Sequence, residues 1–358
     1  MTRAGDGDDR EVWTNPSGVQ YELRSRYGKP VNPLAIKGSV EAFATEVDRV
    51  RACVSSMAAR CQFEDTPACP ICGDVHWSPG LVVHGIAYVE CDNCTHAFTR
   101  RRLAPADLDA YYRDAAEYVP VHVSPATAKA RVEAIANPKV DLILDEFQRV
   151  FGRRPGRLLD VGAGAGHIVA AARAKGLAAD GLEPSTIGRD SCLALHGFEL
   201  LADDFMHFDA TAIRPPFDVL TFWGVLEHTI DPLAYLGRAR ELLAGGGLLL
   251  MEVPRYETFS TVLERILPNL GTRHLDGIEH INCFTDASAA TMLERAGFAP
   301  CFVWYLGLDW YEFAMRMLYR FRDVAVSQFV LDHFDAFQQF NDRARMADGM
   351  IVGARVIS

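Results

Sequence analysis

A glycine-rich loop directly after an apolar run constrains the fold more than any other stretch of this chain. The segment RLLDVGAGAGH, residues 157–167, runs through Asp160 into Gly162, Gly164 and Gly166. Six further strand-like runs follow, the early ones separated by helix-like segments; they are residues 178–184, 198–204, 217–225, 246–254, 300–306 and 349–357. Such alternation is typical of an open sheet with helices on both faces. We therefore predict an α/β fold with a doubly wound, Rossmann-like sheet of seven strands.

The loop and the next strand also indicate a ligand. The dinucleotide fingerprint G-x-G-x-x-G has His167 at its third glycine position here, and the Gly-Lys-Ser/Thr of a triphosphate loop is absent. Asp160 is awkward beside a pyrophosphate but suits a positively charged group. Glu183, at the end of the second strand, can accept hydrogen bonds from both ribose hydroxyls. We expect a ribonucleoside that lacks phosphates and carries a cationic tail.

Four of the nine cysteines have the spacing of a zinc site. Cys69 and Cys72 form one C-x2-C pair, and Cys91 and Cys94 form a second pair after 18 residues. Each pair can turn two thiolates towards one point, and four thiolates leave no coordination position open for water. The alternative, four unrelated buried cysteines, does not explain the paired spacing. We predict a structural zinc ion away from the catalytic centre.

Composition and charge narrow the range of partners. Hydrophobic residues make up 49% of the chain, charged residues 23%, and the formal net charge is −11. Proteins that bind nucleic acid usually present a basic face, and no dense Lys/Arg run occurs here. No apolar run has membrane-spanning length, and the polar N-terminus has no signal-peptide pattern. We expect a cytoplasmic protein that binds a small molecule, and neither nucleic acid nor membranes.

The patterns divide the chain into four expected regions. The first contains an Asp/Gly-rich start, to about residue 15, that looks disordered, and a helix at 39–61. The fourth contains a helical insertion at about 308–346, which could wall a substrate pocket or bury the interface of a homodimer. The regions are a partly helical extension at 1–66, a zinc-binding module at 67–100, a helical linker or lid at 101–155 and the sheet domain at 156–358.

In combination, these motifs resemble class I S-adenosylmethionine-dependent methyltransferases. The resemblance rests on LLDVGAGAGH, GLEPS, FDVLTFWGVLEHTIDPLAYLGRARELLAGGGLLLMEVP and EHINCFTDASAATMLERAGF, and residues 349–357 fit the antiparallel last strand of that family. It implies S-adenosylmethionine as the cofactor. The implied contacts are Asp160, Gly162, Gly164 and Gly166 at the methionine part, Glu183 at the ribose, Asp203 and Asp204 at the adenine, and Trp223 and Gly224 closing over the cofactor.

The cysteine spacing narrows the resemblance further. A four-cysteine module, a "YY…EY" helical segment and then a methyltransferase domain are similar to the zinc-containing C-methyltransferases of deoxysugar biosynthesis. Those enzymes carry a sizeable further C-terminal domain, whereas this chain has a helical stretch before its last strand, so a nucleotide-sugar substrate stays open. The residues that the resemblance places around the substrate are Tyr118, His228, Glu279 and His280.

Methyl transfer requires an aligned nucleophile and, where the acceptor carries an acidic proton, a base. Because the pKa of histidine lies near neutrality, we predict that His280 is the general base or orients the nucleophile, with His228, Glu279 and Tyr118 beside the substrate. Either histidine could instead only brace its loop. Tyr111 and Tyr112 are expected to pack in the core.

A second, catalytic metal is not predicted. In ubiquinone-type O-methyltransferases an E-x-x-E-H run is associated with a divalent metal. Here Gly224 takes the place of the first acid, so Glu227 and His228 lack that partner.

The predicted function is S-adenosylmethionine-dependent methyl transfer to carbon or oxygen of a small molecule, in natural-product or specialised-sugar biosynthesis. One alternative is a zinc-ribbon protein that binds nucleic acid or a protein partner and retains a vestigial methyltransferase fold. Another is a nicotinamide oxidoreductase, against which Asp160 and His167 argue. Binding of S-adenosylhomocysteine separates the first two functions, because a vestigial fold need not bind it.

Overall fold

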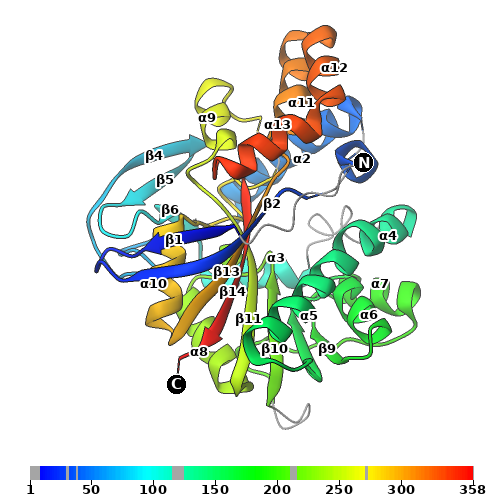
Figure 1. The fold of residues 1–358 in the computed structure, drawn as a ribbon. Helices are drawn as coiled ribbons and strands as arrows, with labels where there is room; N and C mark the ends of the chain where they lie inside the picture. The colour runs from blue at the N-terminus through cyan, green and yellow to red at the C-terminus, as the bar shows by residue number, and fades with distance from the viewer. Residues whose placement is uncertain are drawn as a thin grey trace.

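The computed structural model describes residues 9–29, 32–37, 39–114, 125–209, 216–270 and 273–357 (Figure 1). A sheet of eight strands runs through its centre in the order β1-β2-β13-β14-β11-β10-β8-β9. Strands β8, β9, β10 and β11 are parallel, and β14 is antiparallel to both of its neighbours, β11 and β13. The predicted α/β sheet with an antiparallel last strand is therefore confirmed. Its strands from this part of the chain are β8 Arg157–Val161, β9 Ala178–Leu182, β10 Phe217–Trp223, β11 Leu243–Pro254, β13 Phe298–Leu306 and β14 Gly349–Val356.

Helices cover both faces of the sheet because successive strand residues point to opposite sides. Leu158 and Val219 pack with α5 and α6, whereas Leu159 and Leu220 pack with α8 and α10. These buried residues form two hydrophobic layers with the sheet between them. The flanking helices are α5 Asn137–Phe151, α6 His167–Ala174, α7 Thr186–His196, α8 Pro232–Leu242 and α10 Asp286–Arg295.

The strand predicted at residues 198–204 is wrong. Only Leu201 reaches the sheet, through an isolated parallel bridge to Leu182 in β9. The chain turns away directly afterwards. Asp204 accepts hydrogen bonds from the backbone amide of Met206 at 3.0 Å and from the ring of His207 at 2.6 Å. An aspartate that bonds its own following backbone stabilises a turn in place of a strand.

Two strands that the sequence did not predict come from the N-terminal region. They are β1 Arg10–Thr14 and β2 Gln20–Tyr27. The expectation of disorder to about residue 15 is therefore wrong for β1, whose Trp13 is buried and donates a hydrogen bond to the hydroxyl of Tyr305 at 2.9 Å. Because β2 runs parallel to β13, its carboxyl end lies at the edge of the sheet where β8, β10 and β11 also end.

The cysteine-rich region forms a second, four-stranded sheet in the order β12-β6-β5-β4. Its last member, β12 Asn282–Cys283, comes from far along the chain and pairs with β6. This sheet therefore joins the cysteine-rich region to the segment that contains Glu279 and His280. The other elements are β4 Trp77–Val83, β5 Ile86–Cys91, β6 Ala97–Thr99, the pair β3 Phe63–Asp65 and β7 Arg101–Leu103, and α3 Pro105–Asp114.

Helices also stand above the carboxyl-terminal edge of the central sheet. Phe43 and Val47 of α2 pack against Tyr311 and Met315 of α11. Within the described residues no helix is both long enough and apolar enough to span a bilayer. The bounds are α1 Pro33–Lys37, α2 Val40–Arg60, α9 Phe259–Ile266, α11 Asp309–Phe321, α12 Val324–Asp332 and α13 Phe334–Arg343; α4 Pro125–Arg131 continues through a π-helical turn, Val132–Ala136, into α5.

Candidate functional site

A cavity of about 840 Å³ opens at the carboxyl ends of the parallel strands. Open α/β sheets bind their ligands at this edge. The cavity is lined by the loop after β8, by the ends of β9, β10 and β11, and by residues of α3 and of the loop after α9. It contains all the described residues predicted to contact cofactor or substrate, except for Gly166.

Asp160 is the second-last residue of β8 and lines this cavity. Its side chain is 1% exposed and accepts a hydrogen bond from the hydroxyl of Thr221 at 2.6 Å. Burial raises the pKa of Asp160 to about 7, although the Thr221 hydrogen bond opposes the rise. A cationic ligand beside the carboxylate would lower that pKa and so be stabilised in return. The environment of Asp160 thus favours a positively charged ligand group.

Glu183 follows β9 and fixes the shape of the glycine loop. One carboxylate oxygen accepts a hydrogen bond from the amide of Gly164 at 2.6 Å, and the other accepts from the amide of Ser185 at 2.9 Å. The side chain is 8% exposed, and burial raises its pKa. Because each carboxylate oxygen can accept more than one hydrogen bond, Glu183 can hold this loop and still accept from two ribose hydroxyls.

The loop itself depends on glycine at two positions. Gly162 and Gly166 have φ angles of 69° and 74°, in the left-handed region that strains other residues. A Cβ atom on Gly162 would lie 2.7 Å from Val225, and one on Gly166 would collide with the sulfur of Cys192. Gly166 therefore does not line the cavity but allows α6 to begin close against α7.

The residues predicted at the adenine and over the cofactor also line the cavity. Asp203 is exposed, whereas Asp204 holds the turn described above. Trp223 ends β10, next to Gly224, and its ring lies 4.3 Å below the ammonium of Lys139. Lys139 in turn pairs with Glu252 of β11. Lys139 and Glu252 were not predicted from the sequence, since an isolated Lys and Glu 113 positions apart give no local signal.

His228 and His280 lie side by side, with ring centroids 4.8 Å apart. The Nδ1 of His228 lies 2.8 Å from the carbonyl oxygen of Glu279, so Nδ1 carries the proton and Nε2 holds the lone pair. Burial, and then the neighbouring His280, lower the pKa of His228 to about 3. Burial likewise lowers the pKa of His280, against the effect of Asp276, whose carboxylate is 3.3 Å from His280 Nδ1. Both imidazoles are therefore neutral at physiological pH.

The loop that carries Glu279 and His280 is held by one aspartate. Asp276 accepts hydrogen bonds from the amides of Ile278, Glu279 and His280 at 2.8, 2.7 and 3.2 Å. The hydroxyl of Tyr88, in β5, donates to the carbonyl of His280 at 2.6 Å. These bonds fix the backbone on both sides of the Glu279 side chain.

Tyr111 packs in a buried hydrophobic cluster and Tyr112 packs against it, as expected, and both hydroxyls also contact Glu279. The hydroxyl of Tyr111 donates to the Glu279 carboxylate, and that of Tyr112 donates to its carbonyl at 3.3 Å. Burial raises the pKa of Glu279 to about 7. Adjacent residues on a helix point about 100° apart. The pair "YY" on α3 therefore indicates that the two tyrosines do not both face the same side of the helix. Tyr118 lies outside the described residues.

Glu227, His228 and His280 also bring together three groups that could hold a metal. Their ligand atoms all lie within 4.8 Å of one another. Burial raises the pKa of Glu227 to about 8, so this carboxyl is protonated at neutral pH in the absence of a cation. The sequence analysis placed His228 and His280 together at the substrate but predicted neither a metal there nor Glu227 as a third member.

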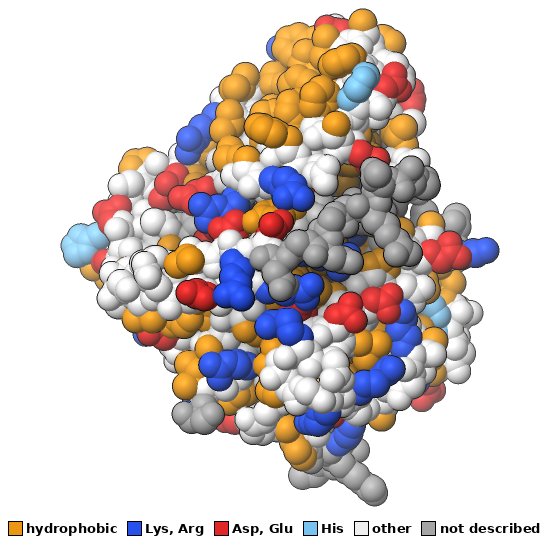
Figure 2. Space-filling model, viewed as in Figure 1, with side chains coloured by type: hydrophobic (Ala, Val, Ile, Leu, Met, Phe, Trp, Pro, Cys, Tyr) orange, Lys and Arg blue, Asp and Glu red, His pale blue; other side chains and the backbone are white. Residues whose placement is uncertain are grey.

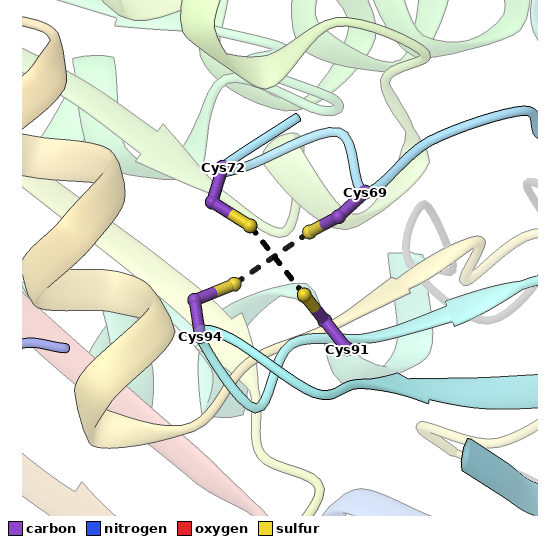
Figure 3. A group of neighbouring side chains, drawn as sticks. All are labelled: Cys69, Cys72, Cys91 and Cys94. Carbon is purple, nitrogen blue, oxygen red and sulfur yellow. Dashed lines mark hydrogen bonds between the residues drawn. The ribbon is translucent and has the colours of Figure 1, made fainter. Parts of the chain in front are cut away.

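The four predicted cysteines converge on one point (Figure 3). Cys69 and Cys94 have sulfur atoms 3.6 Å apart, and Cys72 and Cys91 have sulfur atoms 3.4 Å apart. Four sulfurs at about 2.3 Å from a zinc ion form a tetrahedron with edges of about 3.8 Å. The observed separations are close to this value, so the cluster fits a zinc ion.

A polar contact connects the cysteine-rich region to the histidines. His96, two residues after Cys94, is fully buried and lies 3.0 Å from the amide oxygen of Asn282 in β12. The amide nitrogen of Asn282 donates to the carbonyls of Thr229 at 2.8 Å and Leu226 at 3.4 Å. Asn282 therefore braces the turn Leu226–His228 from the side of the cysteine cluster.

Comparison with known proteins agrees with this geometry. Residues 135–301 match the family described as a methyltransferase domain. The matched segment contains the glycine loop and strands β8 to β11 of the central sheet.

Several similar proteins have names that state a particular activity. Ubiquinone biosynthesis O-methyltransferase from Actinobacillus pleuropneumoniae is 28% identical over 124 residues, which are 32% of this chain and 52% of the relative. The protein of the same name from Cereibacter sphaeroides is 38% identical over 99 residues, or 26% of this chain and 39% of the relative. The chain thus spans about half the length, or less, of these curated relatives. Among solved structures, the plantazolicin methyltransferase BamL bound to S-adenosylhomocysteine is 12% identical with a TM-score of 0.45, over 70% of this chain and 94% of that chain.

Proposed function

We propose that this protein transfers the methyl group of S-adenosylmethionine to a small molecule. One observation carries the proposal: the glycine loop with Asp160 and Glu183 shares a single cavity with His228, Glu279 and His280. A cavity of about 840 Å³ is large enough for a cofactor and a second ligand of moderate size. The cofactor supplies an electrophilic methyl group on a sulfonium, and the protein aligns the acceptor with it.

The side chains have separate tasks in this proposal. Asp160 lies near the cationic methionine part, Glu183 holds the ribose, Asp203 and Asp204 lie at the adenine, and Trp223 closes over the cofactor. The Nε2 lone pair of His228, or the ring of His280, accepts a hydrogen bond or a proton from the acceptor. Glu279, with Tyr118, contacts the remainder of the acceptor.

The acceptor atom is proposed to be oxygen or carbon. The ubiquinone biosynthesis relatives are named as O-methyltransferases, which favours oxygen. The resemblance to deoxysugar enzymes favours carbon. Both acceptor atoms agree with a role in natural-product or specialised-sugar biosynthesis. We also propose that the protein is cytoplasmic and acts on neither nucleic acid nor membranes.

We further propose that Cys69, Cys72, Cys91 and Cys94 hold a structural zinc ion. The convergent sulfurs and their separations support it. Four thiolates saturate a tetrahedral ion, so this zinc has no place for a substrate or water.

Replacing Glu183 with alanine is expected to weaken binding of S-adenosylhomocysteine by about 1.5–3 kcal/mol, or about 10- to 150-fold. The change removes the acceptor of the ribose hydroxyls and leaves the amides of Gly164 and Ser185 without their partner. Isothermal titration calorimetry measures the effect. Glu183→Gln keeps one carbonyl oxygen and should fall between wild type and Glu183→Ala.

Glu199→Ala is the matched control, because Glu199 is exposed and lies outside the cavity. Wild-type affinity in Glu183→Ala would remove this residue from the cofactor site. Wild-type protein that binds NAD tightly and S-adenosylhomocysteine not at all would contradict the proposed function and favour the oxidoreductase.

The homodimer expected from the sequence has a candidate surface on α11–α13. Figure 2 shows hydrophobic side chains gathered over these helices at the top of the molecule. The exposed ones are Phe321, Val324, Val326, Phe329 and Phe340. Exposed apolar patches mark interfaces more often than isolated apolar residues do. We therefore propose that a second copy of the chain covers them.

Light scattering tests this interface. The wild type is expected to have the mass of a dimer, and Phe329→Asp with Phe340→Asp that of a monomer, because two charges would be buried without partners. Val75→Asp is the control, since Val75 is equally exposed but belongs to the cysteine-rich region. A monomeric wild type would refute the dimer.

A further inference from the structure

The cavity has a cationic end that the cofactor does not explain. Seven Lys and Arg residues line the whole cavity, in a chain whose formal net charge is −11. Five of them, from five separate segments, form this end. They are Lys29 after β2, Lys37 in α1, Arg131 at the end of α4, Lys139 in α5 and Arg273 in the loop after α9. Three of the five lie outside the segment 135–301 that matches the methyltransferase family.

The N-terminal strands place Lys29 at this end. The amide of Gly28 donates to the carbonyl of Tyr305 at 3.0 Å, and the indole of Trp304 donates to the carbonyl of Gly28 at 2.7 Å. Both bonds anchor the end of β2 to β13. Lys29 therefore leaves the sheet at the edge where the cofactor loop and the histidines also lie.

The cations at this end differ in whether they have a direct partner. Lys139 pairs with Glu252, and Arg273 has one guanidinium nitrogen 3.5 Å from Asp348. Lys29 and Lys37, by contrast, make no hydrogen bond or ion pair with any residue in the part of the chain that the structure describes. The second terminal nitrogen of Arg273, Nη1, is buried and also has no hydrogen-bond partner there.

Unpaired ammonium groups away from bulk water are unfavourable. Burial, with the nearby cations Arg273 and Arg131, lowers the pKa of Lys29 and of Lys37 to about 8. Glu252 opposes this shift at Lys29, and Glu312 and Glu46 oppose it at Lys37. An anion bound between these groups would relieve their repulsion and supply the missing partners. Both lysines line the cavity and are partly exposed in it, which leaves room for such a group.

Arg273 connects this end to the proposed site of methyl transfer. Its Nη2 atom lies 2.9 Å from the ring of His274, and that ring is 5.7 Å from the ring of His280. The His274 ring therefore lies between Arg273 and the ring of His280, so a group held by Arg273 is close to the histidine pair.

We propose that Lys29, Lys37 and Arg273 bind an oxyanion, a carboxylate or a phosphate, carried by the methyl acceptor. This inference rests on the proposed function, because it assigns the acceptor to the remainder of the methyltransferase cavity. It gives the N-terminal extension a role in substrate selection. The guanidinium of Arg273 suits the planar or tetrahedral oxygens of such a group, and the lysines add point charges.

The test uses the full chain loaded with S-adenosylhomocysteine. Inorganic phosphate and succinate, at millimolar concentrations, are titrated separately by calorimetry into the wild type and into Lys29→Met with Lys37→Met. We expect at least one of the two anions to bind the wild type. The double variant should bind that anion at least about tenfold more weakly. Affinity for phosphate alone indicates a phosphorylated acceptor, and affinity for succinate alone indicates a carboxylic acid.

Two further measurements separate charge recognition from loss of folding. Methionine matches the lysine stem, and replacing an unpaired, half-buried cation with it should leave the melting temperature unchanged or higher. Lys129→Met, on the exposed side of α4, is the matched control and should bind the anion as the wild type does. S-adenosylhomocysteine affinity should be unchanged in all three proteins.

The outcomes also separate this inference from the proposed function. If the wild type binds neither anion, or if the double variant binds it with wild-type affinity, the oxyanion site is refuted while S-adenosylhomocysteine binding still supports methyl transfer. If the wild type fails to bind S-adenosylhomocysteine, the proposed function itself fails.

Discussion

His280→Ala and His228→Ala are each expected to lower the rate of methyl transfer about 10²–10⁴-fold while S-adenosylhomocysteine still binds. The two rings line the cavity with their centroids 4.8 Å apart, and the bond from His228 Nδ1 to the Glu279 carbonyl puts the lone pair on Nε2. Without either imidazole, the acceptor loses the group that orients it or removes its proton. Turnover and S-adenosylhomocysteine affinity are measured for the two alanine variants and for His280→Asn and His228→Asn.

The asparagine variants distinguish orientation from proton transfer, since an amide can accept a hydrogen bond but cannot act as a base at neutral pH. His76→Ala is the control, because His76 is exposed and lies outside the cavity. If both His280 variants turn over at nearly the wild-type rate, His280 only braces its loop and the role passes to His228. If cofactor affinity falls together with turnover, the residue belongs to the cofactor pocket.

The pH dependence of kcat/KM gives a second readout of the same prediction. A histidine that acts as acceptor or base must be deprotonated, so the rate falls as pH drops through its pKa. Burial lowers the pKa of both histidines below their ordinary value of 6.5. The acidic limb of the profile that belongs to them should therefore lie below pH 6.5.

Cys69→Ser is expected to lose the bound zinc and most of the soluble, folded protein. Structural zinc contributes apparent binding free energies of about 10–16 kcal/mol in zinc-finger peptides, and three thiolates around a vacant corner hold the ion far less well. Elemental analysis of wild-type protein purified without added metal should find about one zinc per chain. The variant should contain less than this and should melt at a lower temperature.

Cys61→Ser is the matched control, because Cys61 lies outside the cluster. Folded wild-type protein without zinc, or a Cys69→Ser variant with full zinc and an unchanged melting temperature, would contradict the assignment. A second equivalent of metal that disappears in His228→Ala would locate an additional ion at Glu227, His228 and His280.

Features encoded in short, continuous patterns could be predicted from the sequence. The glycine loop, the acid at the end of each of the first two strands and the two C-x2-C pairs each involve residues a few positions apart. The structure places Asp160 and Glu183 in one cavity and the four sulfurs around one point. The one strand predicted wrongly, at residues 198–204, has the apolar pattern of a strand, but its two aspartates favour a turn.

Features that depend on distant pairing could not be predicted. Strands β1 and β2 consist mostly of polar residues, and β2 joins a strand almost 280 residues later in the chain. The lysines of the cationic end and the contacts of Tyr111 with Glu279 follow from such pairings and from the packing of α3. The sequence likewise gives no signal for Asn282, whose contacts with His96 and Thr229 depend on the position of β12.

The position of β2 in the central sheet limits where this chain can be truncated or joined to another protein. Removal of the first 37 residues would leave β13 as a bare edge strand, with unpaired backbone groups beside the large apolar side chains of Phe302 and Trp304. Exposed edges of this kind pair with other chains and promote aggregation. The segment 135–301 that matches the family leaves out strands that the central sheet uses here, so we expect that enzyme hybrids made with a relative need to carry β1 and β2 as well.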